Sequence, residues 1–89
     1  MPASSESITL TGDLHARPAG ALAVAAGRFA ATVSVAAGGK SVDGKSVLGV
    51  MGLGATSGQQ VTVSADGPDA AQAVATLIAI IAEATRAGS

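Results

Sequence analysis

Large apolar side chains are scarce in this chain, and their scarcity limits the folds that it can adopt. Of the 89 residues, 43 are hydrophobic, but 21 of these are alanine and only 22 have a larger apolar side chain. Such a supply covers one face of a small sheet and not two, so the sequence predicts a thin core between two layers. A large enclosed substrate cavity is excluded.

Several residue types on which common functions depend are absent or occur once. The chain has no cysteine, which excludes disulfides, thiolate catalysis and cysteine-ligated zinc. One histidine, His15, cannot form a multi-histidine metal site, and one aromatic residue, Phe29, provides no stacking platform for bases. The net charge of −1 favours neither nucleic acid nor a membrane surface as a partner. We therefore expect no metal, no cofactor and no nucleic acid.

The chain is expected to form a single domain over residues 1–89. Its N-terminus has no basic stretch followed by an apolar one, as a signal peptide would have. The most apolar run, residues 73–82, is too short to span a bilayer. These features favour a soluble cytoplasmic protein that does not insert into a membrane.

Positive charge gathers in the middle of the chain. Residues 15–60 contain four basic side chains and one acid, whereas the other five acids lie outside this window. The basic residues are Arg17, Arg28, Lys40 and Lys45. If the window forms one face, that face is mildly positive and favours an acidic partner or a phosphate.

Short segments in which apolar and polar residues alternate predict four strands. The expected strands cover residues 7–11, 32–35, a short segment around Val42, and 61–65, with a loop at 56–60 before the last. Residues 1–5 are small and polar and are expected to be a loose start. Gly38 and Gly39 separate the second strand from the third, and glycine accepts the positive φ of a tight hairpin turn.

Three further segments have helical spacing. Pro18 is tolerated only in the first turn of a helix, so the first helix is expected to begin near Ala16. Ser46 is a suitable N-cap for a short helix, and Asp69 is favourable at the start of the longest helix, which Gly88 would close. The order βαββαβα and the limited apolar supply predict an α+β open-faced sandwich with the helices on one face.

His15 lies where the first strand leads into the first helix. A lone histidine is more often a surface or capping residue, but the neighbours of this one favour phosphate chemistry. First-turn helix amides lack intrahelical partners and form a ready phosphate site, here at Ala16 and Arg17. The Arg17 guanidinium can hold phosphate oxygens with two hydrogen bonds. We interpret His15 as a phosphoryl acceptor whose neutral ring attacks with its lone pair, and Arg17 as a phosphate clamp.

The phosphoryl group is expected to come from another protein. The sequence contains no nucleotide-binding loop and no metal motif, so binding of ATP by this chain is not expected. A second nucleophile, an acid–base pair and a cofactor motif are also missing, which disfavours an independent enzyme.

Two segments of the chain resemble the signatures of one family. The first, at residues 14–19, is LHARPA, and the second, at residues 43–55, is DGKSVLGVMGLGA. They are similar to the active-site motif and the regulatory-serine motif of HPr, the histidine-containing phosphocarriers of the bacterial phosphoenolpyruvate-dependent sugar phosphotransferase system. Two motifs at the expected separation are far more specific than either alone, and the resemblance covers nearly the whole chain.

The resemblance implies a fold, a reaction and partners. The family fold is a four-stranded antiparallel sheet with three helices on one side. The family accepts a phosphoryl group from phosphorylated enzyme I on Nδ1 of the histidine that matches His15, and passes it to IIA domains of sugar permeases. By this resemblance the chain is a monomeric, stoichiometric carrier and not an enzyme.

Residues of the second motif have both a structural and a functional interpretation. Ser46 is an N-cap in either case; in some family members a dedicated kinase and phosphatase also act on the matching serine, and in others no such kinase exists. Val47, Leu48 and Met51 are core residues in the simpler interpretation. A short helix flanked by glycines cannot bury all of them, however, so we expect some to form an apolar partner surface beside His15.

The match to the family has departures. Asp13 stands where members usually have glycine, with Gly12 directly before it, and a carboxylate there is expected to disfavour phosphate. Val24 and Gly27 occupy positions where many members have a basic residue, for which Arg28 is a partial substitute. Two other functions therefore remain open: a regulatory phosphocarrier of a nitrogen-type branch, and a binding module that has lost phosphotransfer.

Overall fold

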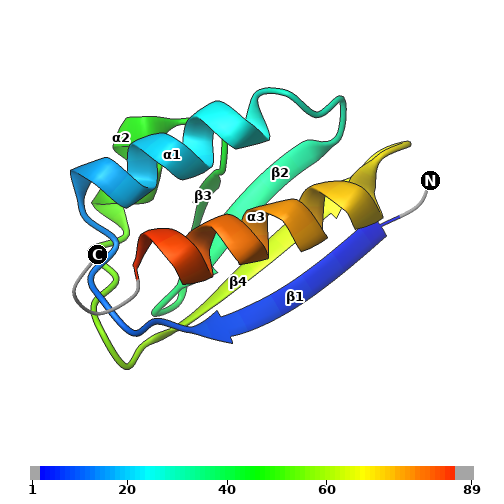
Figure 1. Cartoon of the computed structure of the whole chain (residues 1–89). Coiled ribbons are helices and arrows are strands. Elements are labelled where there is room, and N and C mark those ends of the chain that lie inside the picture. The colour runs from blue at the N-terminus through cyan, green and yellow to red at the C-terminus, as the bar shows by residue number, and fades with distance from the viewer. Residues whose placement is uncertain (1–2, 86–89) are drawn as a thin grey trace.

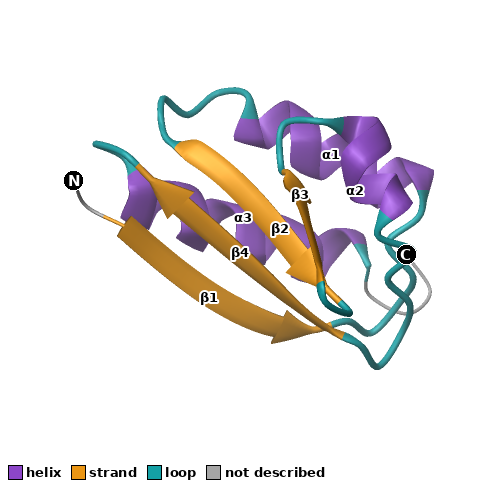
Figure 2. Ribbon diagram, turned by 180° about the vertical axis from the view of Figure 1, so that it is seen from behind, coloured by secondary structure: helices purple, strands orange, loops and turns teal. Residues whose placement is uncertain are grey.

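The computed structural model describes residues 3–85 and consists of one antiparallel sheet with helices on one of its faces (Figure 1). The elements in chain order are β1 (Ala3–Thr9), α1 (Ala16–Ala26), β2 (Thr32–Ala37), β3 (Lys40–Asp43), α2 (Val47–Gly52), β4 (Gln60–Asp66) and α3 (Ala70–Ala84). Seen from behind, the other face of the sheet is not covered by any helix of residues 3–85 (Figure 2). The predicted α+β open-faced sandwich and the order βαββαβα are confirmed.

The sheet has the strand order β1-β4-β2-β3, so the last strand of the chain lies between the first two. Each neighbouring pair is antiparallel. Gly38 and Gly39 form the two-residue turn between β2 and β3, with φ values of 57° and 82°, and the flanking Ala37 and Lys40 pair with each other. Positive φ at both turn positions is what a tight hairpin needs, and the predicted hairpin is confirmed.

The core lies between one face of the sheet and the helices. Val33 and Val35 of β2, and Val61 and Val63 of β4, are buried because alternate residues of a strand face the same side. Leu22 of α1 packs into this layer. The apolar stripe of α3 contributes Val74, Leu77 and Ile81. No helix within residues 3–85 is long and apolar enough to cross a membrane.

The first strand is longer than the sequence predicts. Residues 3–5 pair with the far end of β4, so the expectation of a loose start is wrong for them. The strand carries serines that face solvent, and hydroxyls join it to β4: Ser5 Oγ lies 3.1 Å from Ser64 Oγ, and Ser7 Oγ 2.7 Å from Thr62 Oγ1. An edge strand held by backbone and hydroxyl pairing lacks the apolar alternation by which strands are recognised in a sequence.

Two other boundaries differ from the expected ones, and a third lies outside the described residues. The first strand ends at Thr9 instead of Thr11, and Leu10 is buried just beyond it. Gln60 begins β4 and is not part of the preceding loop. The expected closure of the last helix by Gly88 lies outside the described residues, within which the helix ends at Ala84.

Asp69 is the N-cap of α3, as expected, but its carboxylate makes a longer-range connection. It makes no side-chain cap hydrogen bond and instead accepts from the amides of Ala30, at 2.9 Å, and Ala31, at 2.8 Å. The hydrogen bond from the Ala30 amide is the main reason that the pKa of Asp69 is lowered, and Lys45 also contributes. The start of α3 is thereby tied to the segment between α1 and β2.

Candidate phosphoryl-transfer site

His15 is the N-cap of α1, and its side chain is exposed. Its backbone is extended, with φ −87° and ψ −162°, and the imidazole makes no cap hydrogen bond. The first hydrogen bond of the helix runs from the Ala19 amide to the His15 carbonyl at 3.0 Å. The amides of Ala16 and Arg17 come before this first bonded amide in the chain, and Pro18 has no amide hydrogen. The helix therefore begins with two amides that are available to an anion.

The loop that leads to His15 is fixed on both sides. The Leu14 amide donates to the Ala55 carbonyl at 2.9 Å, and Leu14 is buried. Asp13 Oδ1 accepts from the Ser57 amide at 2.9 Å. At Gly12 the chain passes so close to the end of α3 that a Cβ would collide with the Thr85 carbonyl oxygen. Glycine is therefore required at that position. The loop that carries His15 is fixed by these contacts.

A shallow depression of about 320 Å³ lies beside His15. Its walls come from the loop before α1, from α2 and from the segment that follows α2. They are formed by Asp13, Leu14, His15, Ala16, Met51, Gly54, Ala55 and Thr56. The depression brings together three residues that the sequence singles out for different reasons: His15, Asp13 and Met51.

Arg17 is exposed and lies along another depression, which Ala21, Glu83 and Ala84 also line. His15 is the extended N-cap and lies outside the helix, so helical spacing does not set the direction of Arg17 relative to the imidazole. Among residues 3–85, Arg17 is not one of those that line the depression beside His15. The clamp stays a prediction, and it requires the arginine to turn toward a bound phosphoryl group.

Ser46 is the N-cap of α2, as predicted. Its Oγ accepts a hydrogen bond from the Gly49 amide at 3.0 Å. The helix buries only Val50, and the other apolar side chains of α2 remain outside the core. Val47 is 38% exposed, Leu48 80% and Met51 39%. The expectation that some of these residues remain exposed is confirmed.

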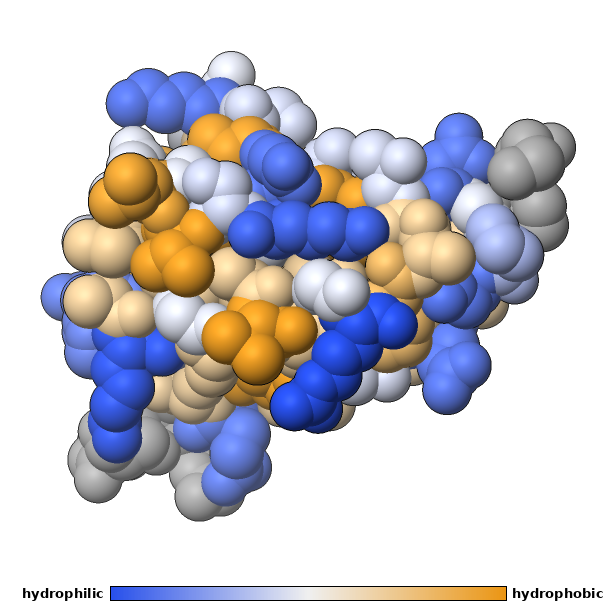
Figure 3. Space-filling view, turned by 90° about the horizontal axis from the view of Figure 1, so that it is seen from above, coloured by the Kyte–Doolittle hydropathy of each residue, from blue (hydrophilic) through white to orange (hydrophobic). Residues whose placement is uncertain are grey.

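Val24 of α1 is also exposed, at 62%, and α1 packs against α2. Figure 3 shows orange side chains distributed over this side of the molecule, with long blue side chains between them. We refer to Val24, Val47, Leu48 and Met51 as the apolar patch. The resemblance places Val24 where many family members have a basic residue that contacts the partner, and its place outside the stripe of Ala19, Leu22 and Ala26 indicates exposure.

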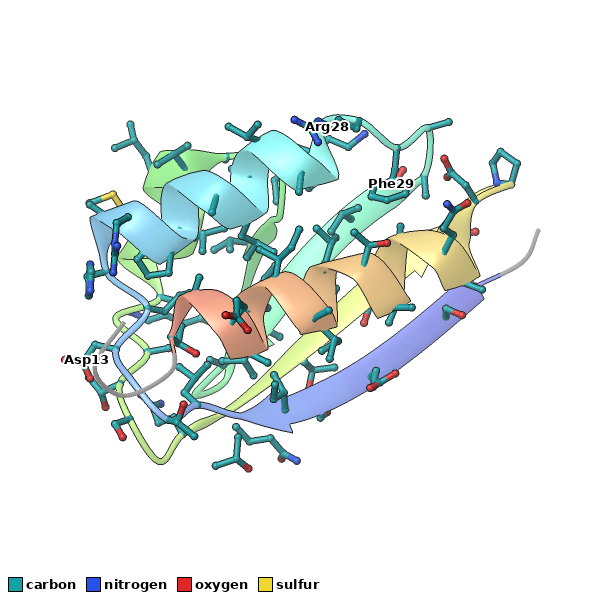
Figure 4. All side chains as sticks on the ribbon, in the orientation of Figure 1. Asp13, Arg28 and Phe29 are labelled. Atoms are coloured by element: carbon teal, nitrogen blue, oxygen red, sulfur yellow. The ribbon has the colours of Figure 1, made fainter. Side chains whose placement is uncertain are left out.

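Basic residues lie at the end of α1 remote from His15. Arg28 follows the last turn of α1, whereas Asp13 lies at the opposite end, before the helix begins (Figure 4). Lys45 Nζ donates to the Phe29 carbonyl at 3.0 Å, which brings its ammonium group to the same segment as Arg28. Within residues 3–85, no group of three acidic, histidine or cysteine side chains could hold a metal ion.

Comparisons with known proteins agree with this geometry. A family model described as the PTS HPr component phosphorylation site matches residues 4–83. Phosphocarrier protein HPr of Cupriavidus necator is 45% identical over 69 residues, which make up 78% of this chain and 78% of that protein.

Solved structures give the same result. The phosphocarrier protein HPr from Bacillus anthracis superimposes with a TM-score of 0.84 at 30% identity, covering 91% of this chain and 99% of that one. A histidine-containing phosphocarrier protein of Mycoplasma gives a TM-score of 0.81 at 35% identity, covering 98% of this chain and 100% of that one. The chain therefore belongs to the HPr family of phosphocarriers of the phosphotransferase system.

Proposed function

We propose that this chain accepts a phosphoryl group on His15 from phosphorylated enzyme I and passes it to IIA domains of sugar permeases. It acts as a monomeric, stoichiometric carrier in the cytoplasm. The observation that supports this most strongly is the state of His15: an exposed imidazole without a cap hydrogen bond, at the start of a helix with two available amides.

The proposed chemistry needs few groups from the protein. His15 is neutral in the reactive form, and the lone pair of Nδ1 attacks phosphorus while Nε2 keeps its proton. The bond from phosphorus to the donor atom breaks, and its electron pair stays with the donor. In such a step the protein mainly positions the group and stabilises the charge on the oxygens, for which the amides of Ala16 and Arg17 and the guanidinium of Arg17 are suited.

The apolar patch is the proposed docking surface. Met51 lines the depression beside His15, so a partner that covers the patch also encloses the histidine. Arg28 and Lys45 flank the far end of α1, and neither α1 nor α2 carries an acid in its first turn. The matching partner surface has an apolar centre and an acidic margin.

Ser46 is proposed as a regulatory site for a serine kinase and phosphatase. A phosphate at this N-cap would be favoured by the free helix amides, so the fold would tolerate it. It would also place about two negative charges directly before Val47 and Leu48, at the margin of a surface that meets acidic partners. Phosphorylation at Ser46 therefore opposes docking without unfolding the chain.

A reconstituted relay tests the proposed function. Phosphoenolpyruvate, enzyme I and a sugar-specific IIA domain are combined with and without this chain, and IIA phosphorylation is followed by intact mass. We expect IIA to be phosphorylated only when the chain is present. Phosphorylation of the chain without transfer to any sugar IIA domain would instead favour the regulatory nitrogen-type branch. A chain that binds enzyme I and never becomes phosphorylated would be a binding module.

A further inference from the structure

We propose that the Asp13 carboxylate opposes phosphorylation of His15 and thereby makes the phosphorylated chain a readier donor. The inference rests on the proposed function, because it concerns the phosphoryl group that His15 would carry. It assigns Asp13 a role in setting how the phosphoryl group is shared between this carrier and its partners.

The charge around His15 is the first observation that supports this role. Among residues 3–85, those that line the depression beside the imidazole include one carboxylate, Asp13, and no lysine or arginine. The nearest arginine in the sequence, Arg17, lies along the other depression with Glu83. A phosphoryl group that arrives on His15 therefore meets a negative side chain in the same depression.

The position of Asp13 is the second observation, because the carboxylate is held in place. Its Oδ1 accepts from the Ser57 amide at 2.9 Å, and the next residue, Leu14, is buried and donates to the Ala55 carbonyl at 2.9 Å. Figure 4 shows Asp13 on the loop directly before α1, at the end of the helix where His15 lies. The Asp13 carboxylate therefore keeps its place on the wall of the depression while the hydrogen bond from the Ser57 amide holds.

Electrostatics determines the direction of the effect. Phosphorylation adds about two negative charges near pH 7, and a fixed carboxylate in the same depression repels them. When the bond between Nδ1 and phosphorus breaks in the next transfer, the ring is left neutral and the repulsion disappears. Because the depression is open to solvent, the effect is moderate and is screened by salt.

An exchange experiment measures this effect. Wild-type chain labelled with ¹⁵N is phosphorylated, freed of phosphoenolpyruvate, and mixed with an equal amount of unlabelled Asp13→Asn and a trace of enzyme I. The phosphoryl group redistributes through enzyme I, and intact mass gives the phosphorylated fraction of each protein. An asparagine at this position keeps a carbonyl oxygen for the Ser57 amide while it removes the charge.

We expect the phosphoryl group to favour Asp13→Asn over the wild type by at least about threefold at low salt, which corresponds to roughly 0.6 kcal/mol. At about 1 M salt the Debye length falls to about 3 Å, so the ratio should approach one. A ratio of one at low salt, or a preference that salt does not reduce, would overturn the proposal. A purely structural role for Asp13 produces no salt-dependent ratio.

Two controls complete the design. Asp66→Asn removes an equivalent exposed charge at the C-terminal end of β4. Asp66 lies about 20 Å along the strand from Gln60, the residue at which β4 begins. The phosphoryl group should be shared equally between this variant and the wild type. A mixture of labelled and unlabelled wild type must also reach equal phosphorylation. If that mixture never redistributes, the carrier function itself fails and this inference fails with it, whereas redistribution with no preference for Asp13→Asn refutes the role of Asp13 alone.

Discussion

His15 at the start of α1 and Met51 on α2 line the same depression, although they belong to different helices and different sequence motifs. A partner that approaches the imidazole therefore also contacts the apolar patch. Phosphoryl transfer and partner docking therefore use one surface. Substitutions on α2 test whether docking depends on the apolar patch.

Met51→Glu should weaken binding to enzyme I by at least about tenfold, or roughly 1.4 kcal/mol, because a charge would have to be desolvated in an apolar contact. The melting temperature should change little, since Met51 is 39% exposed. Calorimetric titration gives the affinity and thermal unfolding gives the melting temperature. Ala75→Glu, on the exposed side of α3, is the matched control and should bind as the wild type does. A large drop in melting temperature with unchanged affinity would make Met51 a core residue.

Arg17→Ala should slow phosphoryl transfer to His15 by about tenfold or more while the fold remains intact. The loss follows from the two hydrogen bonds that a guanidinium can make to a phosphoryl group, and Arg17→Lys should restore only part of the rate. Rapid-quench kinetics with phosphorylated enzyme I measures the rate. An alanine variant as fast as the wild type would show that the helix amides suffice and that Arg17 is not a phosphate clamp.

Ser46→Asp should keep a melting temperature near that of the wild type and raise the enzyme I concentration needed for half-maximal phosphorylation of His15. The added charge is accepted at the start of α2 but opposes docking at the apolar patch. Ser46→Ala should retain transfer and lose on the order of 1 kcal/mol of stability, because the hydrogen bond to the Gly49 amide is removed. Titration with enzyme I distinguishes the two; equal behaviour of Ser46→Asp and wild type would leave Ser46 as a cap only.

Acid should weaken the connection between α3 and the loop after α1. The pKa of Asp69 is lowered in the folded chain, mainly by the hydrogen bond from the Ala30 amide. Its carboxylate therefore adds stability above the unfolded-state pKa of about 3.9, and that stability is lost as the pH falls through the lowered folded value. Asp69→Asn should be less stable than the wild type at pH 7, and the gap should close between about pH 5 and pH 2. Urea unfolding across this pH range, with Asp66→Asn as control, measures the difference in the free energy of unfolding between the wild type and Asp69→Asn. A difference that stays constant with pH would contradict the account.

Most of the fold follows from local patterns in the sequence. Val33 and Val35, and Val61 and Val63, alternate with polar residues and mark the two central strands, and the glycine pair at 38–39 marks the hairpin. The start of β1 was missed because the serines at its beginning pair through backbone and hydroxyls, which leave no apolar signal. The hydrogen bonds from the Ala30 and Ala31 amides to the Asp69 carboxylate were missed because they join distant segments, and a single sequence does not indicate such a pair.

The site was partly predictable for the same reasons. The histidine, the helix start after it and the N-cap at Ser46 are local features, and the structure places them as expected. The direction of Arg17 depends on how α3 packs against α1, which local spacing does not determine. The exposure of Val24 and the anchoring of Asp13 by Ser57 likewise come from the packed chain and not from neighbours in the sequence.

The most direct test of the account is whether His15 carries the phosphoryl group. The chain is incubated with enzyme I and phosphoenolpyruvate and examined by intact mass, beside His15→Ala. We expect the wild type to gain one phosphoryl group that is labile in acid and stable in base, as a phosphoramidate is, and the alanine variant to gain none. No gain with the wild type, or an equal gain with His15→Ala, would contradict the account.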